Sequence, residues 1–446
     1  MRTQPRLAPV PGPVGRVRAR GAPVAGRPPA PPGETWAVRG ALALVVLAIL
    51  DDAFWHREPG TAAGDHVVAA AIPVAVAVAF AVFYPRLRGL VRGFGALCCG
   101  ILAATAGAGV SLRHVLIDRL AGDDVTGLLA GLGGVALIVL GVVTLWRTRR
   151  RDGSLPWRWA RRGVIAVAAV LAGFLVVLPA GVAIIATHRA RSPVSVPDLG
   201  RPAEAVRLRT GDGLTLAGSY VPSRNGAAIV VFPGRSGTAA HARMLVDGGY
   251  GVLVLDRRGE GASEGDFQAY GWGGEPDVRA AVAYLRGRPD VERGRVGGLG
   301  LSVGGELMLQ TAAHDRGLRA VVADGAGVRT LAEHLQTPGL GLLQRWIAPW
   351  PFQQLALAVL STAPAPQALT DLVPRIAPHP VLFIRAEHGA GGEELTPVYH
   401  RAAGEPKALW IVAGAGHTDG LRARPREYAR RVVRFFDRAL HVSADR

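Results

Sequence analysis

A serine stands between glycines in Gly300-Leu301-Ser302-Val303-Gly304, at the point where an apolar run gives way to a helical pattern. The spacing G-x-S-x-G is typical of a turn that exposes a nucleophile between a strand and a helix. The glycines let the backbone turn sharply without a Cβ clash, and the amides that open the next helix point toward the negative charge formed during acyl transfer. We therefore expect Ser302 to be a catalytic nucleophile.

A histidine that activates this serine should follow it in the chain and come directly after another strand. Of the histidines after Ser302, His417 alone directly follows an apolar run and glycines, within Ile411 to Thr418. As a general base it would take the proton of the Ser302 hydroxyl and return it to the leaving group. We expect His417 to fill this role.

The acid that orients the histidine should lie between Ser302 and His417 in the chain. Three glutamates follow the apolar run 381–384: Glu387, Glu393 and Glu394. Many hydrolases place this acid four residues before a proline that opens the next helix, and Glu393 stands four residues before Pro397. Glu393 is the favoured acid, with Glu394 and then Glu387 as alternates.

Acyl transfer also needs two backbone N–H groups to bind the oxyanion of the tetrahedral intermediate. One should come from Val303, directly after the nucleophile, and the other from the glycine-rich turn Phe232 to Gly237. In that turn we expect the amide of Arg235 to be the donor. No metal-binding or nucleotide-binding motif accompanies these residues, so the sequence predicts no metal and no cofactor.

The segments around these residues have a sequence pattern typical of a soluble α/β domain. Short apolar runs, rich in β-branched residues, alternate with helical patterns of 10 to 15 residues such as Glu275 to Arg286. The predicted strands are 227–232, 251–255, 296–299, 318–323, 381–384 and 409–412, after a hairpin over 206–220. This alternation predicts a mostly parallel sheet with helices on both faces, and functional groups at the carboxyl ends of its strands.

Residues 205–440 resemble the α/β-hydrolase superfamily, and within it the dienelactone hydrolase and acyl-CoA thioesterase-like branch. The resemblance is carried, in this order, by the motifs 255–265, 271–278, 300–306, 324–326 and 414–418. It implies an α/β-hydrolase fold and cleavage of an ester or thioester. Asp256 and Asp277 of these motifs are expected to hold a loop beside the site rather than to react.

A long insertion over about 327–378 separates two predicted strands and has an apolar helical pattern. We expect it to form a helical cap over the active site. Its aromatic residues Trp346, Trp350 and Phe352 would line an acyl pocket, touch a bilayer or pack on the catalytic domain.

The N-terminal half differs from the C-terminal half in composition. Residues 1–200 hold 22 arginines, no lysine and 10 acidic residues, a net charge of +12, clustered between long uncharged stretches. This distribution is typical of a membrane protein, not of the basic face of a nucleic-acid-binding protein. Predicted spans cover 67–84, 93–111, 125–146 and 163–187, each long enough to cross a hydrocarbon core of about 30 Å. A fifth span, 36–55, is predicted although its uninterrupted apolar run is short.

Arginine placement predicts the orientation of these five spans. The loops after 67–84 and between the last two spans are rich in arginine, so both should be cytoplasmic. The arginine-rich tail 1–35, which we expect to be disordered, should be cytoplasmic as well. It can lie on the same side of the membrane as these loops only if 36–55 also crosses. The domain that follows 163–187 through a linker, 191–204, then lies outside the cytoplasm.

Together these patterns predict an integral membrane serine hydrolase that acts on a small or lipid-like ester or thioester outside the cytoplasm. A serine peptidase or an acyltransferase is open within the same chemistry. The competing class is a non-catalytic membrane receptor or accessory protein that uses the hydrolase fold as a binding module. The bilayer is the expected partner, nucleic acid is excluded, and the sequence leaves the oligomeric state open.

Overall fold

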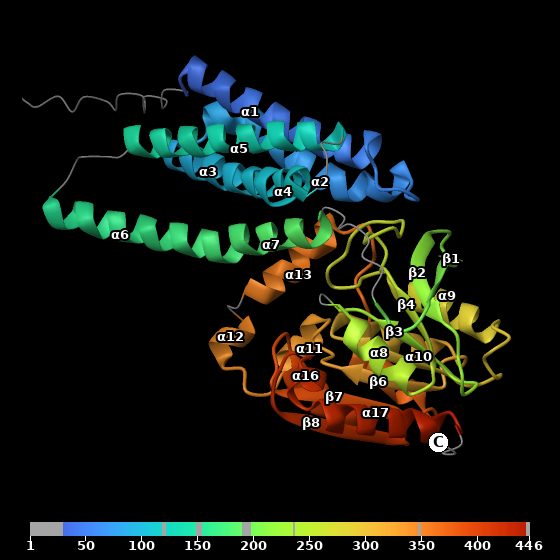
Figure 1. Cartoon of the computed structure of the whole chain (residues 1–446). Helices are drawn as coiled ribbons and strands as arrows, with labels where there is room; N and C mark the ends of the chain where they lie inside the picture. The colour runs from blue at the N-terminus through green and yellow to red at the C-terminus, as the bar shows by residue number, and fades with distance from the viewer. Residues whose placement is uncertain are drawn as a thin grey trace, which may run out of the picture.

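The computed structural model describes residues 30–117, 122–148, 154–189, 198–234, 237–346 and 349–442. A helical N-terminal region lies beside a C-terminal domain built on one sheet (Figure 1). Most of the predicted tail and of the predicted linker lies outside the described residues.

Long apolar helices make up the N-terminal region. They are α1 (Pro32–Leu50), α2 (Ala63–Phe83), α3 (Gly89–Ala106), α4 (Leu112–Ile117), α5 (Gly122–Arg147), α6 (Leu155–Ala172) and α7 (Leu178–Thr187). Three π-helical turns extend them: Asp51–Trp55 after α1, Gly107–Ser111 between α3 and α4, and Gly173–Val177 between α6 and α7. The last of these joins α6 and α7 into one continuous helix.

Among the described residues, four helices are long and apolar enough to cross a membrane, instead of the five that we expected. They are Ala63–Arg86, Gly89–Ser111, Asp124–Arg147 and Leu155–Thr187, and each contains one of the four longer predicted spans. The fifth predicted span forms α1 and its π turn, which are not among the four. Glu34 and Arg39 lie in the first half of α1, and Asp51 and Asp52 follow it directly.

Although α1 is more polar than the other helices, its two ends are tied to the ends of its neighbours. At one end Glu34 accepts hydrogen bonds from Tyr84 after α2 (2.7 Å) and from Thr144 of α5 (3.2 Å), and the guanidinium of Arg92 in α3 lies 3.8 Å away. At the other end Asp51 accepts a hydrogen bond from Thr126 near the start of α5 (2.6 Å). The helix α1 therefore runs the length of the bundle, antiparallel to α2 and α5.

The C-terminal domain is built on one eight-stranded sheet in the order β1-β2-β4-β3-β5-β6-β7-β8. Its strands are β1 (Glu204–Arg209), β2 (Thr215–Val221), β3 (Ala228–Phe232), β4 (Gly251–Leu255), β5 (Val296–Leu301), β6 (Ala320–Asp324), β7 (Val381–His388) and β8 (Lys407–Gly416). The pairs β1–β2 and β2–β4 are antiparallel, and every later pair is parallel. The predicted strands and their mostly parallel arrangement are thus confirmed.

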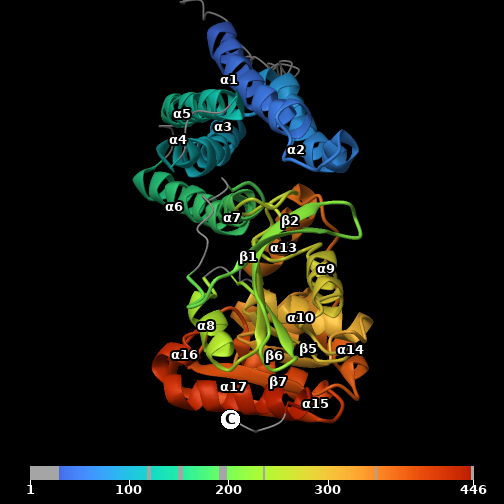
Figure 2. The same ribbon diagram turned by 45° about the vertical axis from the view of Figure 1, so that its right-hand side comes forward.

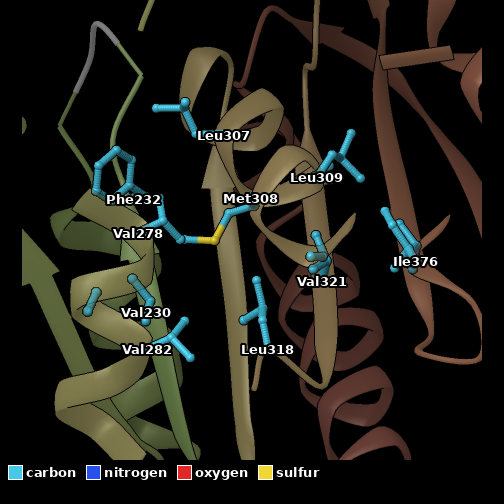
Figure 3. Packing of buried hydrophobic residues seen from close by; sticks show 14 of the residues in the cluster. Val230, Phe232, Val278, Val282, Leu307, Met308, Leu309, Leu318, Val321 and Ile376 are labelled. Atoms are coloured by element: carbon cyan, nitrogen blue, oxygen red, sulfur yellow. The ribbon is translucent and has the colours of Figure 1, made fainter. Parts of the chain in front are cut away.

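Helices cover both faces of this sheet. They are α8 (Ala239–Asp247), α9 (Glu275–Arg286), α10 (Val303–His314), α15 (Thr396–Ala402), α16 (Gly420–Ala423) and α17 (Pro425–Ala439). One core lies between the sheet and α9, α10 and α15, and a second between the sheet and α8 and α17. In the first core Met308 of α10 packs among side chains of β3, α9 and β6 (Figure 3). The strands β3 to β6 are fully buried because both faces are covered, which explains their continuous apolar sequences.

The predicted insertion forms α11 (Leu331–Gln336), α12 (Leu342–Trp346), α13 (Pro349–Leu360) and α14 (Leu369–Leu372). The longest of these helices, α13, rises from the C-terminal domain and packs against α7 (Figure 1). Trp350 stacks on His334 with ring centroids 4.7 Å apart, and Phe352 lies between the two halves. The side chain of Trp346 lies outside what the structure describes.

The two halves meet where α13 lies against α7 (Figure 2). Among the described residues they also share an apolar cluster and two backbone hydrogen bonds at the segment 265–272, between β4 and α9. The amide of Gly265 donates to the carbonyl of Pro59 (2.8 Å), and that of Ala269 donates to the carbonyl of Ala186 (2.9 Å). Phe267 and Trp272 are buried in a cluster with residues of α7 and α13. The helical region therefore packs directly against the loops at the carboxyl edge of the sheet.

Candidate active site

Ser302 occupies a sharp turn between β5 and α10, at the carboxyl edge of the sheet. Its backbone angles, φ 53° and ψ −121°, are unusual for a residue with a side chain. Strain of this kind persists only where the surroundings impose it, and it projects the hydroxyl out of the turn. Ser302 is 9% exposed.

The glycines around Ser302 are required by close backbone contacts. A Cβ on Gly300 would lie 2.2 Å from the carbonyl oxygen of Gly304, and a Cβ on Gly304 would lie 2.3 Å from that of Phe232. The turn therefore packs directly on itself and on the end of β3. This is the physical reason for the G-x-S-x-G spacing.

His417 follows β8, the last strand of the sheet, and its side chain reaches across to Ser302 after β5. Its Nε2 lies 2.9 Å from the Ser302 Oγ, and its Nδ1 hydrogen bonds to Oε1 of Glu393. The imidazole is partly exposed, whereas the Glu393 side chain is fully buried. The second carboxylate oxygen of Glu393 accepts a hydrogen bond from the amide of Ala386 (2.8 Å). Both carboxylate oxygens are therefore held in place.

Of the three candidate acids, the structure brings only Glu393 to the histidine. Glu393 opens a short 3-10 turn directly after Gly392, whose φ is 95°, and this bend directs the carboxylate back under β7. Glu394 is half-buried in the same turn. Glu387 is exposed and accepts a hydrogen bond from the amide of Gly414 (2.8 Å).

The expected oxyanion donors lie on either side of the serine. Val303 is the first residue of α10, so its N–H has no acceptor within the helix. Arg235 lies outside the described residues. The preceding residue, Gly234, approaches so closely that a Cβ there would lie 2.8 Å from the Cβ of Ser302. The turn after β3 therefore passes directly beside the nucleophile.

Two buried carboxyl groups that we did not single out as site residues surround the triad. Asp324, at the end of β6, accepts a hydrogen bond from the Tyr428 hydroxyl (2.7 Å). The pKa of Asp324 is raised to about 7, mainly by burial and also by the nearby Glu393, against the opposing effects of Tyr428 and His417. Asp324 did stand in one of the motifs that carry the family resemblance, but nothing in its local spacing indicated burial beside the histidine.

Glu306 is the second of these groups, one helical turn after Ser302 in α10. It accepts a hydrogen bond from the amide of Gly327 (3.2 Å), and the guanidinium of Arg329 lies 3.5 Å away. Burial raises the pKa of Glu306 to about 7, against the opposing effect of Arg329. The i, i+4 spacing from Ser302 was a signal that Glu306 lies on the same side of the helix.

The expected structural role of Asp277 agrees with its contacts. It is fully buried and accepts hydrogen bonds from the Arg258 guanidinium, the shortest at 2.6 Å. Asp256 accepts a hydrogen bond from the amide of Ala262 (3.3 Å). Both carboxylates hold the segment 256–277, and neither contacts the triad in the described residues.

Comparison with known proteins agrees with this geometry. A family model described as X-Pro dipeptidyl-peptidase (S15 family) matches residues 205–376, less than half of the chain and without Glu393 and His417. The serine turn after β5, the strand order and this match together decide the architecture. The C-terminal half has the α/β-hydrolase fold. The matching family is a different one from the dienelactone hydrolase and thioesterase-like branch that the sequence motifs suggested.

Several proteins resemble this α/β hydrolase. The uncharacterized protein YfhR of Escherichia coli K12 is 28% identical over 256 residues, which cover 54% of this chain and 82% of YfhR. The uncharacterized protein Rv2307c of Mycobacterium tuberculosis is 28% identical over 228 residues, covering 48% of this chain and 72% of that protein.

Solved structures are similar at lower identity. The Pyrococcus furiosus esterase Pf2001 is 19% identical with a TM-score of 0.45, covering 56% of this chain and 98% of the esterase. The α/β hydrolase GrgF from Penicillium sp. sh18 is 20% identical with a TM-score of 0.45, covering 54% of this chain and all of GrgF.

Proposed function

We propose that the chain is a membrane-anchored serine hydrolase that cleaves a carboxylic ester or thioester through an acyl-enzyme. The observation that carries the proposal is the hydrogen-bonded series Ser302, His417 and Glu393, with Ser302 at a strained turn after β5. Nucleophile, base and orienting acid in one chain of hydrogen bonds are what nucleophilic acyl transfer requires.

In the proposed reaction the Ser302 Oγ attacks the substrate carbonyl while its proton passes to the Nε2 of His417. Glu393 orients the imidazole and stabilises its charged form. The amides of Val303 and Arg235 bind the oxyanion of the tetrahedral intermediate. When this intermediate collapses, the leaving group takes the proton from His417. Water then attacks the acyl-enzyme by the same route and releases the acid.

A serine-reactive probe tests the nucleophile. We expect a fluorophosphonate probe to label the detergent-solubilised wild-type protein and the control Ser223→Ala, whose hydroxyl lies in a turn away from the triad. Ser302→Ala should not be labelled. Labelling of Ser302→Ala at the wild-type level, or no labelling of the correctly folded wild type, would support the non-catalytic binding module instead.

A serine peptidase is the second candidate, because the matching family model is that of an X-Pro dipeptidyl-peptidase. The two activities are separated by comparing hydrolysis of p-nitrophenyl butyrate with that of alanyl-proline p-nitroanilide. We expect the ester to be cleaved with the higher kcat/KM. A higher kcat/KM for the anilide would assign the enzyme to the peptidases. An acyltransferase would reveal itself by a product ester when an alcohol acceptor is added.

The proposed membrane placement is supported by how the helices alternate. At one end of the bundle lie Glu34 of α1, Tyr84 after α2, Arg92 of α3 and Thr144 of α5. At the other end His188, after α7, lies 3.6 Å from Asp52, after α1. Five antiparallel segments therefore bring the arginine-rich loops to one end and the α/β hydrolase to the other. Since positive loops stay in the cytoplasm, we propose five crossings, with the hydrolase outside it.

A further inference from the structure

A large cavity lies between the helical region and the α/β hydrolase, separate from Ser302. Its volume is about 1670 Å³, and α1, α2, α3, α7 and α13 contribute to its walls. Small-molecule sites usually have volumes of roughly 300–1,000 Å³, so the space suits a larger ligand. Within the bundle the walls are mainly hydrocarbon, including Leu42, Ala70, Leu102 and Pro179.

The cavity opens sideways between α2 and α7. Val76 of α2 and Val176 before α7 line it, yet they are 59% and 57% exposed. Exposed valine at the middle of apolar helices faces hydrocarbon when the helices cross a membrane. The opening is therefore on the side where the proposed bilayer lies.

The end of the cavity next to the hydrolase is polar, with charges of both signs. His66 lies 3.8 Å from Asp266, and His188 lies 3.6 Å from Asp52. The guanidinium of Arg189 stands over the ring of Phe267 at 5.6 Å. The polar side chains among them all line the cavity, and so does Arg258. The cavity is thus apolar along its length and polar at one end.

Irregular helix geometry contributes to this space. Residues of all three π-helical turns line the cavity, among them Ala53, Val110 and Leu175. A π turn inserts one residue into a helix, often at a functional site. Three such turns in three helices, all bordering one cavity, are a second observation that favours a binding site over an incidental packing gap.

We propose that this cavity binds the acyl chains of a membrane lipid, which enters sideways from the bilayer, with the head group at the polar end beside segment 265–272. The inference depends on the proposed membrane insertion, but not on the proposed catalysis. An amphiphile matches both parts of the cavity, because hydrocarbon walls offer hydrogen-bond partners to neither water nor a wholly polar ligand. Charges of both signs at the polar end suit a zwitterionic head group.

The test uses the full-length protein in dioleoylphosphatidylcholine nanodiscs that contain a phosphatidylcholine with a diazirine on one acyl chain. After illumination, mass spectrometry should place the adducts on residues that line the cavity. Ala69→Trp on α2 and Ala180→Trp on α7 would fill the cavity. They should lower these adducts at least about fivefold, because a filled site leaves no room for the chain. The control Ala71→Trp replaces an exposed alanine of the same helix α2, on the face opposite the cavity-lining residues, and should stay within about twofold of wild type.

Equal adduct yields in Ala69→Trp, Ala180→Trp and Ala71→Trp would show lipid bound only around the bundle and would overturn the proposal. Adducts confined to the outer faces of α2 and α6 in the wild type would do the same. Fluorophosphonate labelling of the same samples reports on Ser302 separately. Loss of adducts with retained labelling therefore supports the lipid site, whatever the substrate of the enzyme.

Discussion

At the scale of single residues, the identity of the acid depends on one turn. Glu387, Glu393 and Glu394 lie within eight residues and share the same chemistry. The positive φ of Gly392 and the 3-10 turn that follows it bury Glu393 against the Ala386 amide. The spacing to Pro397 favoured Glu393, but sequence alone did not show which carboxylate would be turned inward.

Glu393→Gln should therefore retain the fold and lower kcat for a p-nitrophenyl ester by roughly 10³–10⁴-fold, because the imidazole loses its orientation and the partner of its charged form. Glu394→Gln and Glu387→Gln serve as matched controls and should stay near the wild-type rate. Steady-state kinetics on the three variants provide the comparison. A large loss in either control, with Glu393→Gln unaffected, would place the acid elsewhere.

A second prediction at the scale of residues concerns Asp324 and the pH dependence of stability. The folded-state pKa of Asp324 is raised to about 7, mainly by burial, above its ordinary value of 3.8. A carboxyl whose pKa is higher in the folded state stabilises the fold fully below the unfolded pKa, and this stabilisation is lost as the pH rises through the folded pKa. Between about pH 4 and pH 7 the contribution of Asp324 to the free energy of unfolding should therefore fall, by at most about 1.4 kcal/mol for each increase of one in pH.

Asp324→Asn should flatten this part of the stability profile, since an amide does not titrate and its oxygen still accepts from Tyr428. Thermal unfolding of the detergent-solubilised protein at a series of pH values measures the effect. If the two proteins lose melting temperature in parallel from pH 4 to pH 7, Asp324 is not the group responsible.

At the scale of elements, the β5–α10 turn is fixed by backbone contacts. Gly304→Ala would place a methyl group 2.3 Å from the Phe232 carbonyl oxygen, so the end of β3 or the turn itself must move. We expect the rate of fluorophosphonate labelling to fall at least about 100-fold, because a displacement near 1 Å has effects of this size on catalysis. Gly287→Ala, where the nearest atom is 3.5 Å away, is the control and should label normally. Unchanged labelling of Gly304→Ala would mean that the turn tolerates the displacement.

Much of the fold follows from element patterns. The buried strands are short and apolar on both faces, and the motif around Ser302 sits where β5 ends, so the sheet and its reactive edge are predictable from local sequence. The contacts of the cap were harder to predict, because an apolar helical pattern does not indicate which elements the helices pack against. The helix α13 packs on α7, a contact between segments about 170 residues apart that no local pattern encodes. Glu306 had a local signal in its spacing from Ser302, but its pairing with Arg329, which follows the next strand, was missed for the same reason.

At the scale of the whole molecule, the number of crossings separates two arrangements. With five crossings, the N-terminal tail and the loop after α2 lie on the same side of the membrane. If α1 does not cross, they lie on opposite sides. The short apolar run of α1 left this open in the sequence, whereas the contacts of Glu34 and Asp51 favour the full crossing.

Single cysteines in a background lacking Cys98 and Cys99 resolve the question. In intact cells a membrane-impermeant maleimide should label Arg434→Cys, on the exposed side of α17, but neither Ala22→Cys in the tail nor Leu87→Cys in the loop after α2. All three should be labelled once the cells are opened. Labelling of Ala22→Cys in intact cells would indicate four crossings instead of five. Labelling of Leu87→Cys in intact cells would indicate the opposite orientation.

The two backbone hydrogen bonds at Gly265 and Ala269 bear on how the protein is divided. A protein that begins after the last membrane helix would leave both amides without the carbonyls of Pro59 and Ala186, and would expose Phe267 and Trp272 to water. The boundary of the folding unit therefore differs from the boundary of the sheet. The long apolar helices supply part of the surface of the α/β-hydrolase domain, so its stability, and the catalysis that we propose for it, belong to the full-length chain.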